Sequence, residues 1–221
     1  MSPETLVTAV VINYKTPALT RRATTSFRAH YQTVPLLLID NGSKDESASM
    51  FDEFRRQSLS NTDVIINAQN LHHGPTMDQA LHYLHSQYVL FIDSDCEIFN
   101  GGFIESMLSL AHNDPHAYAI GKLIYMNKHG FDTAKGENAF PYIRPIFMLI
   151  NRALYLTLPP FQLHGSPCLK NMRAAVEKGL RLIDFPIEKF AHHHGRGTAS
   201  RHGYNLGWRG KLNYLLNKAG L

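Results

Sequence analysis

The segment Tyr88-Val89-Leu90-Phe91-Ile92-Asp93-Ser94-Asp95 decides the fold expected of this chain. Its apolar run has the composition of a buried strand, and two carboxylates follow at its end. Because residues two apart on a strand point to the same side, Asp93 and Asp95 are expected to present their oxygens together. Carboxylates so placed repel each other unless a cation or a hydrogen-bond donor lies between them. The segment therefore predicts a site for Mg²⁺ or Mn²⁺, and the alternative for such a pair is a solvated turn.

Length and composition favour one folded domain. The chain has 221 residues, of which 44% are hydrophobic, and this is ample for the core of a single α/β domain. Its formal net charge is +4 and its pI is about 9.0. A mildly basic chain suits ligands that carry phosphate, but the excess of charge is too small to indicate nucleic acid or a membrane by itself.

The two cysteines and the first five residues indicate the cellular compartment in which the protein is expected. Cys96 and Cys168 lie far apart, a pattern typical of free thiols in a reducing compartment rather than of a disulfide framework. Residues 1–5 lack the basic-then-apolar pattern of a signal peptide, and no stretch of about 18 apolar residues occurs. These features lead us to expect a cytoplasmic protein.

Apolar β-branched runs alternate with segments rich in helix formers in the first part of the chain. Strands that alternate with helices predict an α/β fold with a mostly parallel sheet flanked by helices. Ligands of such sheets bind beyond the carboxyl ends of the strands, where polar turns occur at Asn13, Asp40, Asn70 and Asp93. The expected strands are 6–12, 34–39, 63–67 and 88–93, and the expected helices are 18–31, 46–57 and, after a Gly74-Pro75 loop, 76–86.

Short motifs in register give the chain a resemblance to a known family. They are Val11-Ile12-Asn13-Tyr14, Ile39-Asp40-Asn41-Gly42-Ser43, Asn70 with Gly74 and Asp78, Phe91-Ile92-Asp93-Ser94-Asp95, and the segment His192-His193-His194-Gly195-Arg196 after Pro186. Over residues 6–198 the sequence resembles the family 2 glycosyltransferases of the GT-A fold. The resemblance implies a single Rossmann-like GT-A domain over residues 1–200 that binds a nucleotide sugar together with Mn²⁺ or Mg²⁺.

The resemblance implies nucleotide contacts at the ends of the strands. Asn13 and Tyr14 would flank the base, and Asp40 would accept a hydrogen bond from the base or the ribose. The alternative for Asp40 is a turn that its own carboxylate closes. Asp78 would face the sugar nucleotide, and its alternative is an acidic residue in the first turn of a helix. The donor-binding residues implied in this way are Asn13, Tyr14, Asp40, Asn41, Gly74, Asp78, Asp93, Ser94 and Arg196.

The same resemblance implies the metal ligands. Asp95 would bind the ion directly, while Asp93 would reach the ribose or a bound water. The family often brings a histidine back to the metal, and His192, six residues after Pro186, is the expected ligand, with His194 as the second choice. Zinc fits less well, because zinc sites need several nitrogen or sulfur ligands. The alternative for the histidines is a polar surface.

The expected general base is missing from its usual place. Inverting members of the family use a carboxylate, typically in a Glu-Asp pair about a dozen residues before a helix-ending glycine. Counting back from Gly179 reaches Pro167-Cys168. Three alternatives remain: the base is His164 or a displaced acid such as Glu137, the reaction is retaining and needs no base, or the chain binds without turnover. An imidazole suits the role because its pKa lies near neutrality.

The acceptor side carries only general signals. Residues 125–144, rich in Gly, Lys and Asn, are expected to form a mobile flap over the acceptor. Arg196 and Arg201 would clamp the departing diphosphate, with a solvated basic tail as the alternative. Residues 201–221 predict a basic amphipathic helix that docks on the domain, and the alternatives are contact with a membrane that carries the acceptor or with a nucleic-acid backbone. The acceptor is left open among a glycan, a lipid-linked glycan, a nucleic acid and a protein.

The function expected from the sequence is transfer of a sugar from a nucleoside diphosphate sugar, with a UDP-sugar as the favoured donor. The metal would lie at Asp93-Ser94-Asp95, and the expected catalytic residues are Asp95 and His164. One alternative is a nucleotidyltransferase, which would have a glycine-rich basic loop after the first strand, but residues 13–17 contain no glycine. The other is a non-catalytic protein that binds nucleotide sugars or glycans.

Overall fold

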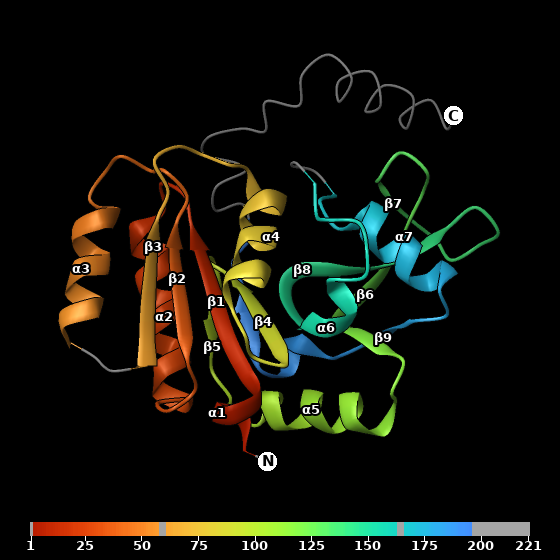
Figure 1. Cartoon of the computed structure of the whole chain (residues 1–221), viewed down its shortest axis with the longest axis horizontal. Helices are drawn as coiled ribbons and strands as arrows, with labels where there is room; N and C mark the ends of the chain where they lie inside the picture. The colour runs from red at the N-terminus through yellow and green to blue at the C-terminus, as the bar shows by residue number, and fades with distance from the viewer. Residues whose placement is uncertain (1, 58–60, 163–165, 196–221) are drawn as a thin grey trace.

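The computed structural model describes residues 2–57, 61–162 and 166–195. Within these residues, eight strands form one sheet in the order β3-β2-β1-β4-β8-β6-β7, with β9 beside β6 (Figure 1). The first four strands are parallel, so the α/β fold predicted from the sequence is confirmed. They are β1 (Val7–Asn13), β2 (Leu36–Asp40), β3 (Thr62–Ile66) and β4 (Tyr88–Asp93).

Helices cover both faces of the sheet (Figure 1). Neighbouring residues of β1 belong to different apolar clusters, Val11 to one and Val10 to the other, because successive strand residues point to opposite faces. No helix among the described residues is both long and apolar enough to cross a membrane. One face is packed by α2 (Pro17–His30), α3 (Ser47–Gln57) and α5 (Phe103–Asn113), and the other by α4 (His73–Tyr83), α6 (Arg152–Tyr155) and α7 (Leu169–Glu177).

The later strands of the sheet are not all parallel. β8 (Phe140–Asn151) runs antiparallel between β4 and β6 (Ala117–Met126), whereas β9 (Arg181–Asp184) runs parallel to β6. The short strand β7 (Asp132–Thr133) pairs with the end of β6, as does the start of β8. The segment 125–144, expected as a flap, is therefore bounded at both ends by paired strands.

The predicted strand 88–93 is confirmed residue for residue, but the helix expected at 76–86 begins earlier. α4 starts at His73 and takes Gly74 and Pro75 into its first turn. Proline is tolerated there because the first turn of a helix has no partner for the missing N–H. A Cβ atom on Gly74 would lie 2.1 Å from the carbonyl oxygen of Gln162, so this close approach of two backbones requires glycine.

A second, two-stranded sheet brings the histidine segment to the end of β4. β5 (Cys96–Ile98) pairs antiparallel with β10 (Ala191–His193), and the 3-10 helix η2 (Ile187–Lys189) leads into β10. The backbone N–H of His194 donates to the carbonyl oxygen of Asp95 at 3.0 Å. This pairing places residues far apart in the sequence next to the acidic turn.

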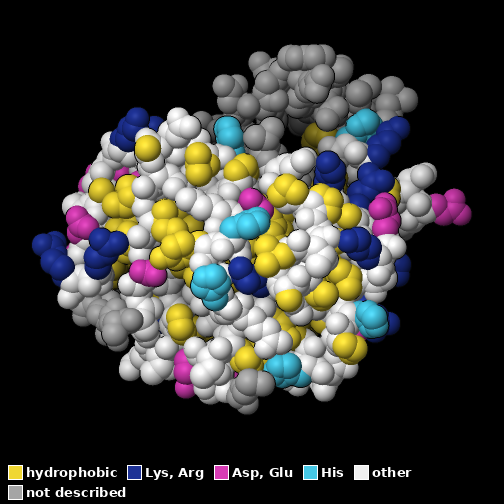
Figure 2. All heavy atoms as spheres, in the orientation of Figure 1, with side chains coloured by type: hydrophobic (Ala, Val, Ile, Leu, Met, Phe, Trp, Pro, Cys, Tyr) yellow, Lys and Arg dark blue, Asp and Glu magenta, His cyan; other side chains and the backbone are white. Residues whose placement is uncertain are grey.

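The charged side chains are mixed on the surface in view. Figure 2 shows Lys and Arg side chains at several separate places among acidic side chains, histidines and apolar patches. The net charge of +4 belongs to the whole sequence, and five of its basic residues lie in 196–221, outside the described residues. The remaining short helix, α1 (Pro3–Leu6), precedes β1.

Candidate metal and nucleotide site

Three potential metal ligands lie together beyond the carboxyl end of β4. One ligand atom from each of Asp93, Asp95 and His193 lies within 4.8 Å of the others. Asp93 ends β4, Asp95 lies in the turn into β5, and His193 ends β10. The Nε2 atom of His193 is 3.2 Å from Oδ1 of Asp95, whose side chain is 10% exposed. We call Asp93, Asp95 and His193 the triad.

The triad has the electrostatics of a cation site. Desolvation, followed by the negative charge of Asp95, raises the pKa of Asp93 to about 7, whereas the charge of His193 lowers it. The hydrogen bond to Asp95 raises the pKa of His193. His73 Nε2 lies 3.7 Å from Oδ1 of Asp93, and desolvation lowers its pKa to about 4, so this imidazole is neutral at pH 7 and adds no positive charge beside the carboxylates. A divalent cation would relieve their repulsion.

The chemistry of the triad narrows the choice of metal. Two carboxylates suit hard ions such as Mg²⁺ and Mn²⁺, and the imidazole suits transition metals better than Mg²⁺. No thiol joins this cluster among the described residues, which argues against the sulfur-rich sites that zinc occupies. The donor set therefore fits Mn²⁺ best, with Mg²⁺ as the weaker alternative.

The sequence predicted His192 or His194 beside the acidic pair, and the structure brings the His193 side chain there. The ring of His192 packs on Phe99 with centroids 4.6 Å apart, and His194 Nε2 contacts Oε2 of Glu97 at 2.7 Å. Both side chains thus engage residues of the β5 segment other than the acidic turn. Successive residues of a strand point to opposite sides, and the spacing from Pro186 fixes the approximate position but not the side.

The neighbouring histidines give a matched test of this placement. We expect His193→Ala to weaken Mn²⁺ binding about tenfold or more, because loss of even an outer partner of a metal ligand costs about 10- to 100-fold. His192→Ala should change the affinity by less than about twofold. Titration calorimetry with MnCl₂ on the two variants measures both effects, and the opposite ranking would show that His192 is the ligand.

Asn13, expected to flank the base, lies beneath the site. Its side chain is fully buried, and its Nδ2 atom donates to Asp40 Oδ1 at 2.8 Å and to the hydroxyls of Ser43 and Ser47 at 3.0 and 2.8 Å. Its Oδ1 atom accepts from the Thr20 hydroxyl at 2.7 Å. The amide therefore joins the loops after β1 and β2 and has no exposed surface to offer a base.

Asp40 and Asn41 also hold loops together. Asp40 is 2% exposed and accepts a hydrogen bond from the Ser43 N–H at 3.1 Å, which is the loop-closing role given above as the alternative. Asn41 donates to Oδ1 of Asn70 at 3.1 Å and accepts from the N–H of Leu71 at 3.0 Å. The two residues fix the polar edge of the sheet on which a nucleotide would lie.

The other expected donor-binding residues differ in exposure. Asp78 accepts a hydrogen bond from the Tyr155 hydroxyl and lies in the second turn of α4, not the first. Ser94 is buried, with its hydroxyl 3.2 Å from that of Thr16. Tyr14 is half-buried at the end of β1, with the Lys15 ammonium 5.4 Å from its ring centre. Tyr14 is therefore more exposed than the buried residues Asn13, Asp40, Asn41 and Ser94.

The place expected for a general base is buried. Gly179, at φ +79, follows the end of α7 as the sequence indicated, and Cys168 caps the start of that helix. Cys168 is 0% exposed, and desolvation raises the pKa of its thiol, so it can act neither as base nor as nucleophile. Glu137 is exposed between β7 and β8. His164, Arg196, Arg201 and residues 201–221 lie outside the described residues.

Two residues that lie beside the triad were not identified from the sequence. His73 is indistinguishable in sequence from an ordinary loop histidine, and Arg144 follows aromatic residues in a segment expected as a flap. Arg144 is close enough for its positive charge to lower the pKa of His193, against the larger effect of Asp95. Only the pairing of β8 with β4 reveals Arg144, because the two strands are distant in the sequence.

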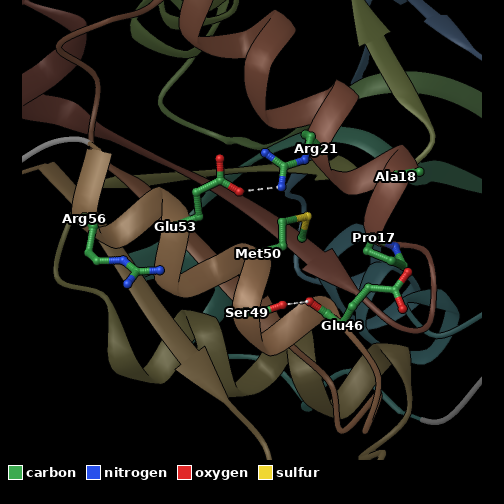
Figure 3. A pocket seen from close by; sticks show the side chains of 8 residues that line it. All are labelled: Pro17, Ala18, Arg21, Glu46, Ser49, Met50, Glu53 and Arg56. Carbon is green, nitrogen blue, oxygen red and sulfur yellow. Dashed lines mark hydrogen bonds and ion pairs between the residues drawn. The ribbon is translucent and has the colours of Figure 1, made fainter.

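A hollow of about 500 Å³ lies elsewhere, between α2 and α3. Figure 3 shows Arg21 of α2 directed toward Glu53 of α3, with their charged atoms 2.6 Å apart. Both side chains are more than a third exposed, so the pair contributes little to stability. None of the triad lines this hollow, whose walls are Pro17, Ala18, Arg21, Glu46, Ser49, Met50, Glu53 and Arg56.

A family model identifies the family of this chain. The sequence matches the family model described as Glycosyl transferase family 2 over residues 8–177. Among curated proteins no match is found.

The mannosyltransferase PcManGT from Pyrobaculum calidifontis, in complex with GDP-Man and Mn²⁺, superposes with a TM-score of 0.64 at 14% identity, over 81% of this chain and 54% of that chain. S. aureus TarS 1–349 in complex with UDP-GlcNAc gives 0.63 at 16% identity, over 89% and 61%. GalNAc-T7 with UDP, GalNAc and Mn²⁺ gives 0.74 at 12% identity, over 95% and 47%. The chain thus spans less than two thirds of each, and identities this low show a shared fold.

Proposed function

The chain belongs to glycosyl transferase family 2, and on this premise we propose that it transfers a sugar from a nucleoside diphosphate sugar to an acceptor, using a divalent cation. The convergence of Asp93, Asp95 and His193 within 4.8 Å at the carboxyl edge of the sheet carries the proposal. Ligands of open α/β sheets bind at this edge. Mn²⁺ in the complexes of PcManGT and GalNAc-T7 supports the choice of metal.

Each group has a stated part in this proposal. Asp93, Asp95 and His193 hold the cation, which when bound supplies a Lewis acid for the charge on the departing nucleoside diphosphate. Tyr14 contacts the base at the end of β1. Among residues that the structure does not describe, His164 takes the proton from the acceptor and Arg196 contacts the diphosphate. UDP is the favoured nucleotide, supported by the UDP and UDP-GlcNAc complexes of two proteins of similar fold.

Nucleoside diphosphate release tests the proposal. The protein is incubated with a panel of UDP- and GDP-sugars and MnCl₂, with EDTA as the metal-free control, and the release of UDP or GDP is followed. Metal-dependent release from at least one donor supports a glycosyltransferase. Pyrophosphate release from a nucleoside triphosphate would instead indicate a nucleotidyltransferase, and binding without any release would indicate a non-catalytic protein.

Metal binding should weaken in acid. Because the pKa of Asp93 is raised to about 7 and that of His193 is also raised, both groups bind protons as the pH falls toward 6. Protonated ligands cannot bind the cation, so we expect the Mn²⁺ affinity to fall about tenfold or more between about pH 8 and pH 6. Titration calorimetry with MnCl₂ across this pH range measures the affinity. An Mn²⁺ affinity that does not change with pH would contradict the assigned ligands.

A further inference from the structure

Strand β8 continues past the end of β4 and along the acidic turn. In the antiparallel pairing of β4 with β8, the last pair is Ile92 with Phe147, and Arg144 lies three residues further along β8 in the direction of the acidic turn. The Cys96 thiol, on the residue after Asp95, donates to the carbonyl oxygen of Ile146 at 3.3 Å. Arg144 therefore lies beside the turn that holds two members of the triad.

Arg144 has a weak partner in the structure. Its guanidinium forms an ion pair with Asp132 of β7, and the two side chains are 41% and 58% exposed. Exposed ion pairs of this kind contribute little, because water competes for both charges. A guanidinium binds phosphate oxygens through two parallel hydrogen bonds, and such charge-assisted pairs are stronger. A diphosphate at the triad would thus compete well with Asp132.

We propose that Arg144 is a positioning residue for the donor, exchanging Asp132 for the diphosphate when the nucleotide binds. This inference rests on the proposed function, since it needs a diphosphate at the triad. In the free protein the Arg144–Asp132 pair links β8 to β7, and the exchange frees the Asp132 side chain while β7 stays paired with β6. Arg144 therefore recognises the number of phosphates and not the base.

Binding of uridine, UMP and UDP to an Arg144→Gln variant, each with MnCl₂, tests this role by calorimetry. We expect UDP to bind about tenfold more weakly than to the unaltered protein, while uridine changes by less than about twofold, because only UDP offers the diphosphate. Arg144→Lys keeps the charge without the paired hydrogen bonds. Its affinity for UDP should lie between those of the unaltered protein and Arg144→Gln. This variant also serves if Arg144→Gln fails to fold, as judged by its melting temperature.

Arg181→Gln is the matched control. Arg181 pairs with Asp114 at 3.2 Å, and it lies at the start of β9, at the opposite edge of the sheet from the triad. Its loss should leave UDP binding within about twofold of the unaltered protein. Asp132→Asn should tighten UDP binding about two- to fivefold, because Arg144 then has no competing partner.

The outcomes separate two failures. If the unaltered protein binds neither UDP nor GDP with MnCl₂, the proposed function and this inference both fail. If it binds UDP and Arg144→Gln binds UDP equally well, only the inference is overturned. Loss of UDP binding in Asp132→Asn as large as in Arg144→Gln would also overturn it, because the ion pair would then act as a structural unit.

Discussion

Asp95→Asn is expected to abolish Mn²⁺ binding and metal-dependent nucleoside diphosphate release, with a loss of about a hundredfold or more. The substitution keeps the shape of the side chain and removes the charge that holds the cation. Asp95 is 8% exposed and contacts His193, so no other described carboxylate replaces it in the triad. Removing its charge should also lower the pKa of Asp93, which Asp95 raises. Calorimetry and a pH titration of the variant measure the two effects.

Glu97→Gln provides the control for Asp95→Asn. Glu97 lies two residues further along the chain and contacts His194 and Arg22 at 2.7 and 3.6 Å, outside the triad. We expect Mn²⁺ affinity within about twofold of the unaltered protein. Equal losses in the two variants would mean that the region's overall negative charge, and not a defined site, binds the cation. Full retention of Mn²⁺ by Asp95→Asn would rule out the triad.

Asn13→Ala is expected to lower the free energy of unfolding by about 3–5 kcal/mol, a large part of the roughly 5–15 kcal/mol of a typical domain. The substitution leaves Asp40, Ser43, Ser47 and Thr20 without the amide that they contact, at a site that is 0% exposed. Each buried group left without a partner costs about 1–3 kcal/mol, and some relaxation offsets the sum. Urea denaturation of both proteins measures the difference.

An exposed asparagine gives the comparison for Asn13. Asn100 donates to the carbonyl oxygen of Lys189 at 3.0 Å in an exposed setting, so Asn100→Ala should cost less than about 1 kcal/mol. If Asn13→Ala is as stable as Asn100→Ala but no longer binds UDP, Asn13 contacts the base, as the family resemblance implied. A larger loss of stability in Asn13→Ala than in Asn100→Ala supports the loop-joining role that the buried contacts of Asn13 indicate.

The sequence by itself determined the parallel half of the fold and the position of the acidic pair at the carboxyl edge of the sheet. The run 88–93 could be assigned because a β-branched and aromatic segment bounded by polar residues forms a buried strand with few alternatives. Once β1 to β4 are parallel, their polar ends share one edge, so the acidic pair had to lie beside the loops after Asn13 and Asp40. These conclusions need only local patterns and one rule of topology.

Only the tertiary structure decided which side chains meet at that edge. His193 instead of His192 or His194 reaches Asp95 because β10 pairs with β5 in a particular register, and a shift of one residue would turn the other histidines inward. Arg144 comes beside the triad through the pairing of β8 with β4, and Asn13 is buried, where its amide joins two loops. Such contacts depend on pairings between segments distant in the chain, which local sequence patterns do not encode.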